Sequence, residues 1–200
     1  MCEGVINVLK PPGMTSHDVV ECLRRLSGQK RVGHTGTLDP LATGLLVLCL
    51  GAATKAVVYL ADEPKVYQVE AELGTSTDTQ DRTGRVLARH PACVITHRAL
   101  REALAGFFGP GTQVPPLYSA VRVGGERLYR LARAGRTAVV PPRPIYIEAI
   151  ELDWPAETER PLFRYGDRFG FTVKGSRGLY VRTLCHDLGE KLGCGAHLVE

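Results

Sequence analysis

The 200-residue sequence lacks any apolar run of the roughly 18 residues that a membrane-spanning helix needs. The longest candidate, residues 45–50, has the length of a buried strand instead. The first residues contain no basic segment followed by an apolar stretch, so we expect no secretory signal peptide. These absences argue against a membrane protein or a secreted one. A cytoplasmic protein without a membrane partner is therefore the default expectation.

The common cofactor and metal motifs are absent as well. The sequence has no G-x-G-x-x-G or G-x-x-x-x-G-K-[ST] loop and no G-x-S-x-G elbow. Its six cysteines form no C-x-x-C pair, and the spacing of Cys185, Cys194 and His197 matches no zinc pattern. We expect reduced cysteines that pack as small hydrophobic residues. If the protein is an enzyme, it should use side chains alone, with no cofactor and no metal.

The net charge is small overall, but positive charge is concentrated locally. The net charge of +4 is too small to identify a nucleic-acid partner. Residues 122–143, however, contain six arginines and a single acidic residue, Glu126. A second basic group consists of Arg24, Arg25, Lys30 and Arg31. Such patches attract phosphate backbones, although a solvated helix face would carry similar charges.

The apolar pattern predicts strands and helices without regular βαβ repetition, which favours an α+β domain spanning residues 1–200. Thr15-x-x-Asp18 resembles a capping box that opens a helix ending at Gly28. Further helices are expected near residues 100–107, 126–134 and 181–192. Strands are expected at residues 5–9, 43–50, 67–73, 145–152 and 169–173, and loops at 33–40 and 74–84.

Residues 110–144 have a composition of their own. Six prolines surround the short arginine-rich helix expected near residues 126–134. Proline interrupts helices and sheet ladders, so this segment should leave the core as an excursion that carries the basic patch.

Residues 33–44 form the most informative segment. Three glycines and Pro40 predict an unusual rigid loop just before a buried strand, and Asp39 lies within it. The following proline holds the backbone of Asp39 extended. A rigid loop at a sheet edge is a suitable place for a reactive carboxylate. Asp39 could equally be a turn residue that bonds its own backbone, because aspartate is common in turns for that reason.

This segment resembles the catalytic signature G-H-x-G-T-L-D-P-x-A-x-G of the TruB pseudouridine synthases, with every fixed position filled. Four more segments resemble motifs of that family in the same order: residues 10–16 (K-P-x-G-x-T-S), 65–67 (K-x-Y), 115–122 (P-P-x-Y-S-A-x-K, with Arg122 for the lysine) and 176–184 (S-x-G-T-Y-I-R-S-L). The resemblance extends over residues 4–199 and implies the family's fold, a mixed, largely antiparallel central sheet flanked by helices.

The resemblance also implies a reaction, the isomerisation of uridine 55 in the T loop of tRNA to pseudouridine. It implies that Asp39 is the essential carboxylate, that Arg182 pairs with it, and that Tyr67 stacks on the extruded uracil. From the residues alone, Arg182 could be a surface arginine at a helix start and Tyr67 an ordinary core aromatic. Whether Asp39 attacks C1′ or C6 or removes a proton stays open.

Other residues are implied to bind the substrate. His34 would lie where the target base leaves its stack, and Lys10 would support the active site or meet a phosphate. Tyr180 belongs to the last motif. Residues 110–144 correspond to a segment that clamps the T arm, with phosphate contacts from Arg122, Arg127, Arg130 and Arg133. The partner is then tRNA alone, bound by a monomer that requires no other protein.

In the family, an L-R-R segment and a small PUA-like domain follow the position of Glu200, and we expect both to be missing from these 200 residues. Two alternatives stay open. One is a guide-RNA-dependent synthase of a ribonucleoprotein, against which the arginine-rich excursion argues. The other is a non-catalytic tRNA-binding fragment, against which the presence of Asp39, Tyr67 and Arg182 argues.

Overall fold

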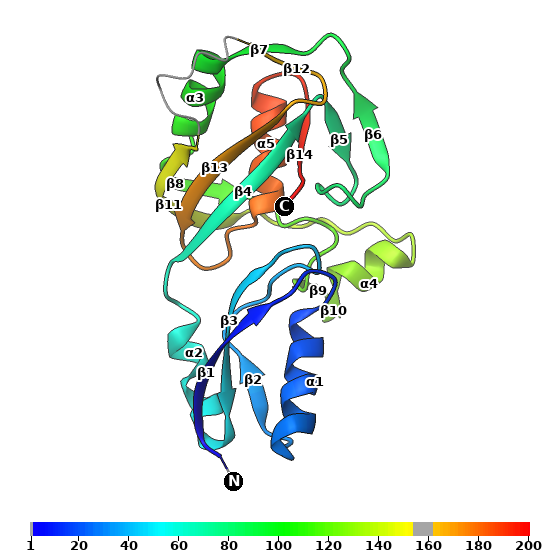
Figure 1. Ribbon diagram of the computed structural model, residues 1–200. Helices are drawn as coiled ribbons and strands as arrows, with labels where there is room; N and C mark the ends of the chain where they lie inside the picture. The colour runs from blue at the N-terminus through cyan, green and yellow to red at the C-terminus, as the bar shows by residue number, and fades with distance from the viewer. Residues whose placement is uncertain (1, 154–161) are drawn as a thin grey trace. The chain divides into compact units, whose positions relative to one another are not determined.

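The computed structural model describes residues 2–153 and 162–200, which divide into two compact units (Figure 1). Unit 1 is Met1–Glu63 and unit 2 is Pro64–Glu200. Both combine helices with antiparallel strand ladders, so the predicted α+β class with a largely antiparallel sheet is confirmed. Within the described residues, no helix has the length and apolar character needed to cross a membrane.

Unit 1 contains a three-stranded sheet of order β1-β3-β2. Its elements are β1 (Gly4–Lys10), α1 (Ser16–Ser27), β2 (Val32–His34), β3 (Gly44–Leu50), the 3₁₀ segment η1 (Gly51–Ala56) and α2 (Val57–Leu60). The apolar strand β3, predicted as a buried strand, occupies the centre of this sheet. The predicted loop at residues 33–40 is wrong at its start, because Gly33 and His34 pair with Cys49 and Leu48 in the sheet.

Helix α1 follows from local sequence signals. The Thr15 side chain accepts a hydrogen bond from the Asp18 amide while the Asp18 carboxylate accepts one from the Thr15 amide, so the predicted capping box is confirmed. The helix ends at Gly28, whose φ of 64° lies in the left-handed region that favours glycine. Its apolar side packs on the sheet through a small core of Val19, Val20, Leu23, Val32, Leu46, Leu48 and Leu50.

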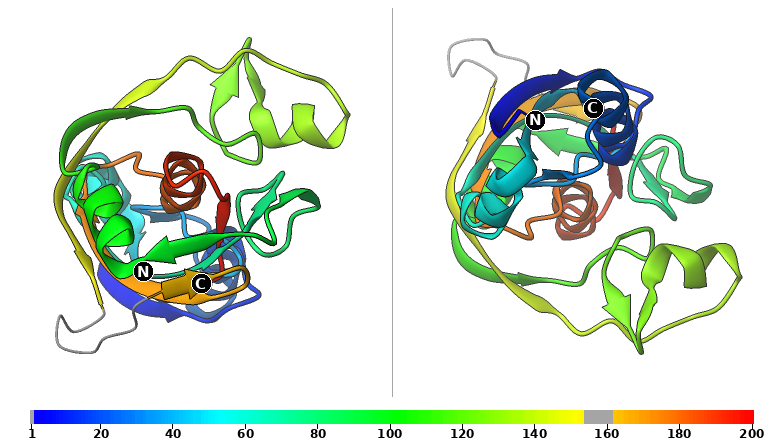
Figure 2. Two further views of the ribbon diagram at one scale, coloured as in Figure 1. Left: turned by 90° about the horizontal axis from the view of Figure 1, so that it is seen from above. Right: turned by 90° about the horizontal axis from the view of Figure 1, so that it is seen from below.

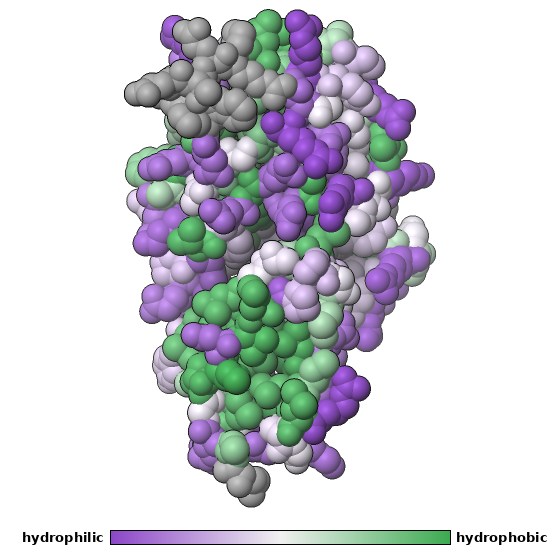
Figure 3. All heavy atoms as spheres, viewed as in Figure 1, coloured by the Kyte–Doolittle hydropathy of each residue, from purple (hydrophilic) through white to green (hydrophobic). Residues whose placement is uncertain are grey.

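The other face of this sheet is apolar at its surface. Leu9 and Leu45 lie opposite each other on β1 and β3 and are 77% and 64% exposed. Val5, on the same face of β1, is exposed too. Figure 3 shows this area as a largely green patch over β1 and β3. A contiguous apolar patch is more typical of a contact surface than single exposed leucines are.

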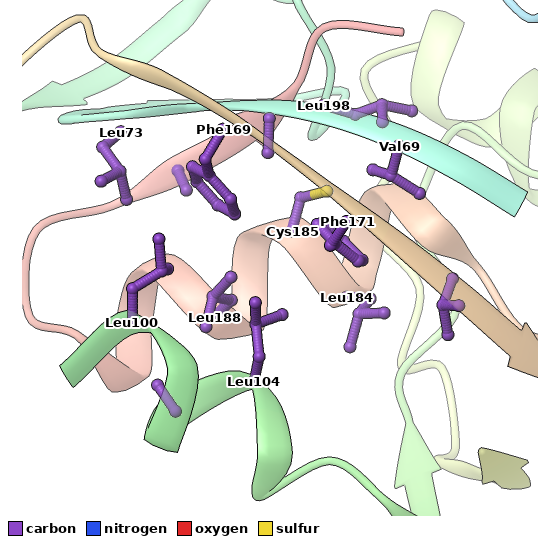
Figure 4. Packing of buried hydrophobic residues seen from close by; sticks show 14 of the residues in the cluster. Val69, Leu73, Leu100, Leu104, Phe169, Phe171, Leu184, Cys185, Leu188 and Leu198 are labelled. Carbon is purple, nitrogen blue, oxygen red and sulfur yellow. The ribbon is translucent and has the colours of Figure 1, made fainter. Parts of the chain in front are cut away.

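Unit 2 is built on a five-stranded antiparallel sheet of order β14-β4-β13-β11-β8. Its strands are β4 (Lys65–Leu73), β8 (Gly109–Gln113), β11 (Arg143–Leu152), β13 (Arg168–Gly175) and β14 (Ala196–Leu198). Two helices, α3 (His97–Ala105) and α5 (Val181–Lys191), cover one face of it (Figures 1 and 4). Strand β4 includes the strand predicted at residues 67–73, and its apolar residues Val69, Ala71 and Leu73 are buried in alternation with polar ones.

The core of unit 2 lies between this sheet and the two helices. Figure 4 shows Leu100 and Leu104 of α3 and Leu184 and Leu188 of α5 facing the strands. The strands contribute Val69, Leu73, Phe169, Phe171 and Leu198 to the same core. This packing fixes the start of α5 relative to β4 and β13.

Cysteines add to the apolar interior. All six are free thiols, and Cys49, Cys93, Cys185 and Cys194 are buried, in agreement with the prediction of reduced, packed cysteines. Burial, with a smaller effect of the neighbouring Cys93 thiol, raises the pKa of Cys194 to about 12. Such a thiol remains protonated at neutral pH and is unreactive.

Unit 2 also contains two short strand pairs beside the sheet: β5 (Thr75–Thr77) with β6 (Val86–Arg89), and β7 (Val94–Thr96) with β12 (Leu162–Arg164). The predicted loop at residues 74–84 is therefore wrong in part, because β5 is a buried strand. Sequence reasoning missed it because its three residues are polar and lack the apolar alternation of a half-buried strand.

The excursion predicted at residues 110–144 begins and ends inside the sheet. Residues 110–113 belong to β8 and residues 143–144 to β11, and these two strands pair with each other. The part that leaves the sheet is residues 114–142, visible in yellow-green in both views of Figure 2. It holds β9 (Arg122–Val123), β10 (Glu126–Arg127) and α4 (Leu128–Arg133) around a small core of Val121, Leu128 and Leu131.

Candidate active site

The Asp39 loop in unit 1 is tethered on both sides of the carboxylate. On one side, the Leu38 amide donates to the Ser16 hydroxyl over 2.9 Å, and that hydroxyl donates back to the Leu38 carbonyl. On the other side, the Gly13 amide donates to the Pro40 carbonyl over 2.7 Å. The motifs at residues 10–16 and 33–44 therefore form one structure, although they are far apart in the sequence. Asp39 is held by backbone contacts of its neighbours and is itself partly exposed.

Lys10 is the buried centre of this structure. Its side chain has no exposed surface, and its ammonium donates to the carbonyls of Pro11 and Met14 over 2.8 Å and approaches that of Pro40 at 3.5 Å. Burial lowers the pKa of Lys10, and the negative charge of Asp39 opposes that shift. An ammonium surrounded by three carbonyls supports the loop. This geometry favours the predicted supporting role over a phosphate contact.

Replacing Lys10 with methionine, which has a similar length and no charge, should lower the free energy of unfolding of unit 1 by about 1–3 kcal/mol, because carbonyls of both loops lose their donor. Chemical denaturation measures this loss. If Lys10 only supports the loop, the salt dependence of RNA binding should not change. The matched control is Lys55→Met, at an exposed position of unit 1. A flatter salt dependence in Lys10→Met alone would instead show that Lys10 contacts phosphate.

His34 ends β2, opposite Leu48 of β3, and is half-buried. Its Nδ1 is buried and has no hydrogen-bond partner among the described residues. A buried ring nitrogen without a partner is costly and suits a position where a ligand supplies the missing partner. This geometry is compatible with the predicted place of His34 beside the target base.

Arg182 in unit 2 is a buried residue in the first turn of α5, so the alternative of a surface arginine is wrong. Its guanidinium donates to the carbonyl of Thr79 over 2.9 Å and to that of Tyr118 over 3.1 Å. It also lies 3.9 Å from a carboxylate oxygen of Asp81. Three segments, the loop after β5, the start of the excursion and α5, therefore fix the position of this cation.

Asp81 is a buried carboxylate beside Arg182 that the sequence reasoning did not assign to the site. Its carboxylate is buried and accepts hydrogen bonds from the Thr79 hydroxyl (2.7 Å), the Thr83 amide (2.9 Å) and the Thr83 hydroxyl (2.6 Å). Gln80 beside it adopts a left-handed φ of 64°, and its side chain accepts a bond from the Thr183 hydroxyl. The signal in the sequence was the series of threonines on either side of Asp81, which can satisfy a buried carboxylate.

The two predicted tyrosines also belong to unit 2. Tyr67 is the third residue of β4, opposite Val173 of β13, and packs against the core while staying partly exposed. Tyr180 caps the start of α5, where its amide and carbonyl both bond the side chain of Gln113 in β8. The Tyr180 side chain packs on the small core of the excursion. Tyr180 therefore joins the excursion to the helix that carries Arg182.

The predicted phosphate-binding arginines lie on the excursion and are exposed. Arg122, Arg127 and Arg130 line a hollow of about 480 Å³ together with Gly124, Gly125 and Glu126. Arg127 and Arg133 lie over the ring of Tyr129, with guanidinium carbons 6.0 and 5.7 Å from its centre. Glu126 pairs with Arg136 at 3.0 Å, so the acidic residue of the segment neutralises an arginine outside this set.

The site residues thus fall into two sets. Lys10, His34 and Asp39 belong to unit 1, whereas Tyr67, Tyr180, Arg182 and the excursion arginines belong to unit 2. In the described part of the chain, no three His, Cys, Asp or Glu side chains gather as a metal site. The chemistry available is that of a carboxylate on a rigid loop, a fixed buried arginine, aromatic rings and a strongly basic surface.

Comparisons with known proteins agree with these features. The profile described as TruB family pseudouridylate synthase (N terminal domain) matches residues 24–181. The chain is 48% identical over 198 residues to the tRNA pseudouridine synthase B of Geotalea uraniireducens, covering 99% of this chain and 61% of the relative. It is 49% identical over 196 residues to the enzyme of the same name from Symbiobacterium thermophilum, covering 98% of this chain and 64% of the relative.

A solved structure is similar too. One chain in the crystal structure of a Cbf5-Nop10-Gar1 complex matches with a TM-score of 0.70 and 30% identity, over 98% of this chain and 46% of that chain. The present chain therefore spans less than two thirds of the length of these proteins. The two sequence relatives share one name, and the matching profile describes the same class of enzyme.

Proposed function

Since the chain belongs to the TruB family of pseudouridylate synthases, we propose that it isomerises a uridine in the T loop of tRNA, uridine 55, to pseudouridine. The observation that carries this proposal is the Asp39 loop, held rigid by Ser16, Gly13 and the buried Lys10. A reactive group on a loop fixed from both sides is preorganised for one geometry.

The reaction sets the requirements for the site. The bond between N1 and C1′ breaks, the uracil turns, a bond forms between C5 and C1′, and the proton of C5 is replaced by one on N1. A carboxylate can assist by adding to C1′ or C6 or by accepting a proton, and each role requires it to be ionised. In this proposal Asp39 is that carboxylate, and Arg182 is the cation that keeps it ionised.

The target base must leave its stack before any of these steps. We assign Tyr67 as the aromatic surface that stacks on the extruded uracil, because it is the partly exposed ring at the start of β4. His34, with its unpartnered buried nitrogen, is assigned to the place where the base leaves the RNA stack. Tyr180 completes the base-binding set. It is also bonded to the sheet through Gln113, so it would link base binding to the excursion.

The excursion is proposed to clamp the T arm. Replacing Arg127, Arg130 and Arg133 together with alanine should weaken binding of a T-arm stem-loop and flatten its salt dependence. Each lost phosphate contact should lower the slope of log affinity against log salt by roughly 0.7–0.9. Filter binding across a salt series measures this slope. Turnover at saturating RNA should change much less, because these side chains lie on a segment separate from the Asp39 loop.

The matched control for this triple variant is Arg98→Ala with Arg101→Ala, two exposed arginines of α3. Its slope should equal that of the wild type. If the folded triple variant also keeps the wild-type slope, the excursion arginines do not contact phosphate. They would then serve another purpose, such as a solvated face around Tyr129.

A guide-RNA-dependent activity is the second candidate, favoured by the likeness to the Cbf5 chain. The 48% identity to a tRNA pseudouridine synthase B, against 30% to the Cbf5 chain, supports the tRNA activity instead. A bare T-arm stem-loop separates the two. Incubated with the purified chain and no other protein or RNA, it should gain one pseudouridine per molecule by nucleoside analysis. A stem-loop that stays unmodified while bound would favour the guide-dependent or the non-catalytic alternative.

A further inference from the structure

A second basic hollow lies in unit 1, at the end of α1 away from the Asp39 loop. It has a volume of about 470 Å³ and is lined by Glu21, Arg24, Arg25, Gly28, Gln29 and Lys30. None of these residues belongs to the motifs that identify the Asp39 site. The proposed reaction gives this hollow no role.

The charges around the hollow are unevenly engaged. Glu21 forms an ion pair with Arg24 and lies 3.4 Å from His17. Arg24 also donates to the Val32 carbonyl over 3.3 Å. Arg25 and Lys30 are exposed and form no ion pair among the described residues. The hollow therefore presents two cations without an ion pair, although Arg25 also donates to the Cys22 sulfur over 3.3 Å. Its single carboxylate is already paired.

Gln29 is a second and independent observation. The residue is only 8% exposed, and its side-chain nitrogen has no acceptor within the described ranges of the chain. The Nε of Arg24 is buried without an acceptor as well. Buried donors without partners are rare in native proteins, and each is satisfied when an oxygen ligand binds. Two such donors beside two cations that have no ion pair select an anion with several oxygens.

The helix dipole accounts for only part of this arrangement. Arginines in the last turn of a helix interact favourably with its negative end, which explains the placement of Arg24 and Arg25. Lys30 lies beyond the helix, and the dipole gives no reason for burying an unpaired amide of Gln29. A phosphate group suits all four of these side chains. Its charge is bound by the arginines and the lysine, and its oxygens accept hydrogen bonds from the N–H donors of Arg24 and Gln29.

We propose that this hollow binds a phosphate group, supplied by the backbone of the RNA substrate. The choice of RNA as the source depends on the function proposed above. Helix α1 has 12 residues, so it spans about 18 Å at 1.5 Å per residue. Its first residue, Ser16, bonds the Asp39 loop, and the hollow lies at its other end. An RNA whose base reaches Asp39 would meet the hollow about five stacked nucleotides away, at roughly 3.4 Å each.

The test is RNA binding by the double variant Arg25→Ala, Lys30→Ala. With a 17-nucleotide T-arm stem-loop, the salt slope should fall by roughly 0.7–0.9, the loss of one phosphate contact. A five-nucleotide RNA with the target uridine at its centre has only two nucleotides on either side, too few to reach the hollow about five stacked nucleotides away, so its slope should not change. Gln29→Met should weaken stem-loop binding without altering the slope, since it removes a donor and no charge. The double variant Arg98→Ala, Arg101→Ala, which removes two exposed arginines of α3, is the charge-matched control.

Three outcomes would overturn the proposal. If the folded double variant has the same salt slope as the wild type, Arg25 and Lys30 do not contact an RNA phosphate. An equal loss with the short and the long RNA indicates a general charge effect. The third outcome combines two measurements. If calorimetry shows that the wild type binds inorganic phosphate and the double variant does not, while the salt slope of RNA binding is unchanged, the hollow binds a free anion and not the RNA. These experiments measure binding. Their outcome is therefore independent of whether the protein forms pseudouridine.

Discussion

Asp39→Asn is expected to abolish pseudouridine formation while leaving the affinity for a T-arm stem-loop within a few-fold of the wild type. The substitution keeps the size of the side chain but removes the charge that every proposed role of this group requires. Loss of a nucleophile or an essential base costs more than the roughly 10²–10⁴ of general acid–base catalysis. Affinity should survive because it comes from phosphate and shape contacts.

Single-turnover assays with saturating protein measure this effect without interference from binding. Asp62→Asn, at an exposed position of the same unit, is the matched control and should keep full activity. If Asp39→Asn keeps more than about one percent of the wild-type turnover, Asp39 is not the essential carboxylate of the reaction.

Arg182→Met should affect both stability and turnover. The guanidinium of Arg182 is buried with bonds to the carbonyls of Thr79 and Tyr118, and Asp81 lies 3.9 Å away. Removing it leaves a buried carboxylate without its cation, and breaking a buried ion pair typically costs about 3–5 kcal/mol. Turnover should fall at least 100-fold, as when one fixed electrostatic contact to a reacting group is lost.

A double-mutant cycle with Asp81→Asn tests whether the two residues act together. If the buried pair carries the effect, the double variant should be more stable than the sum of the single losses predicts. Arg177→Met, at an exposed position five residues earlier, is the control and should unfold like the wild type. An Arg182→Met variant with wild-type stability and turnover would contradict the role assigned to the pair.

Local signals in the sequence predicted the elements that depend on local chemistry. The capping box at Thr15 and the stop at Gly28 bound α1 because side-chain and backbone hydrogen bonds within a few residues determine helix ends. The strand predicted at residues 67–73 lies within β4. By contrast, β5 is a polar strand, buried by tertiary contacts that no period in its own sequence reveals.

The candidate site also combines features that local sequence predicts with features that depend on long-range contacts. The loop around Asp39 was recognisable because glycine and proline restrict the backbone at fixed positions. The burial of Lys10 against that loop was not, because it depends on carbonyls of residues up to 30 positions away. The pairing of Arg182 with Asp81 joins residues about a hundred positions apart. Spacing along a chain gives no information about contacts of this range.

The central claim, that the Asp39 loop isomerises one uridine of the T loop, is tested most directly by mapping pseudouridine at nucleotide resolution. Unmodified tRNA is incubated with the purified chain, treated with a pseudouridine-specific carbodiimide and copied by reverse transcriptase. We predict a single new stop at uridine 55 with the wild type and none with Asp39→Asn. A wild-type protein that binds the tRNA but produces no stop, or an Asp39→Asn variant that produces the same stop, would contradict the account.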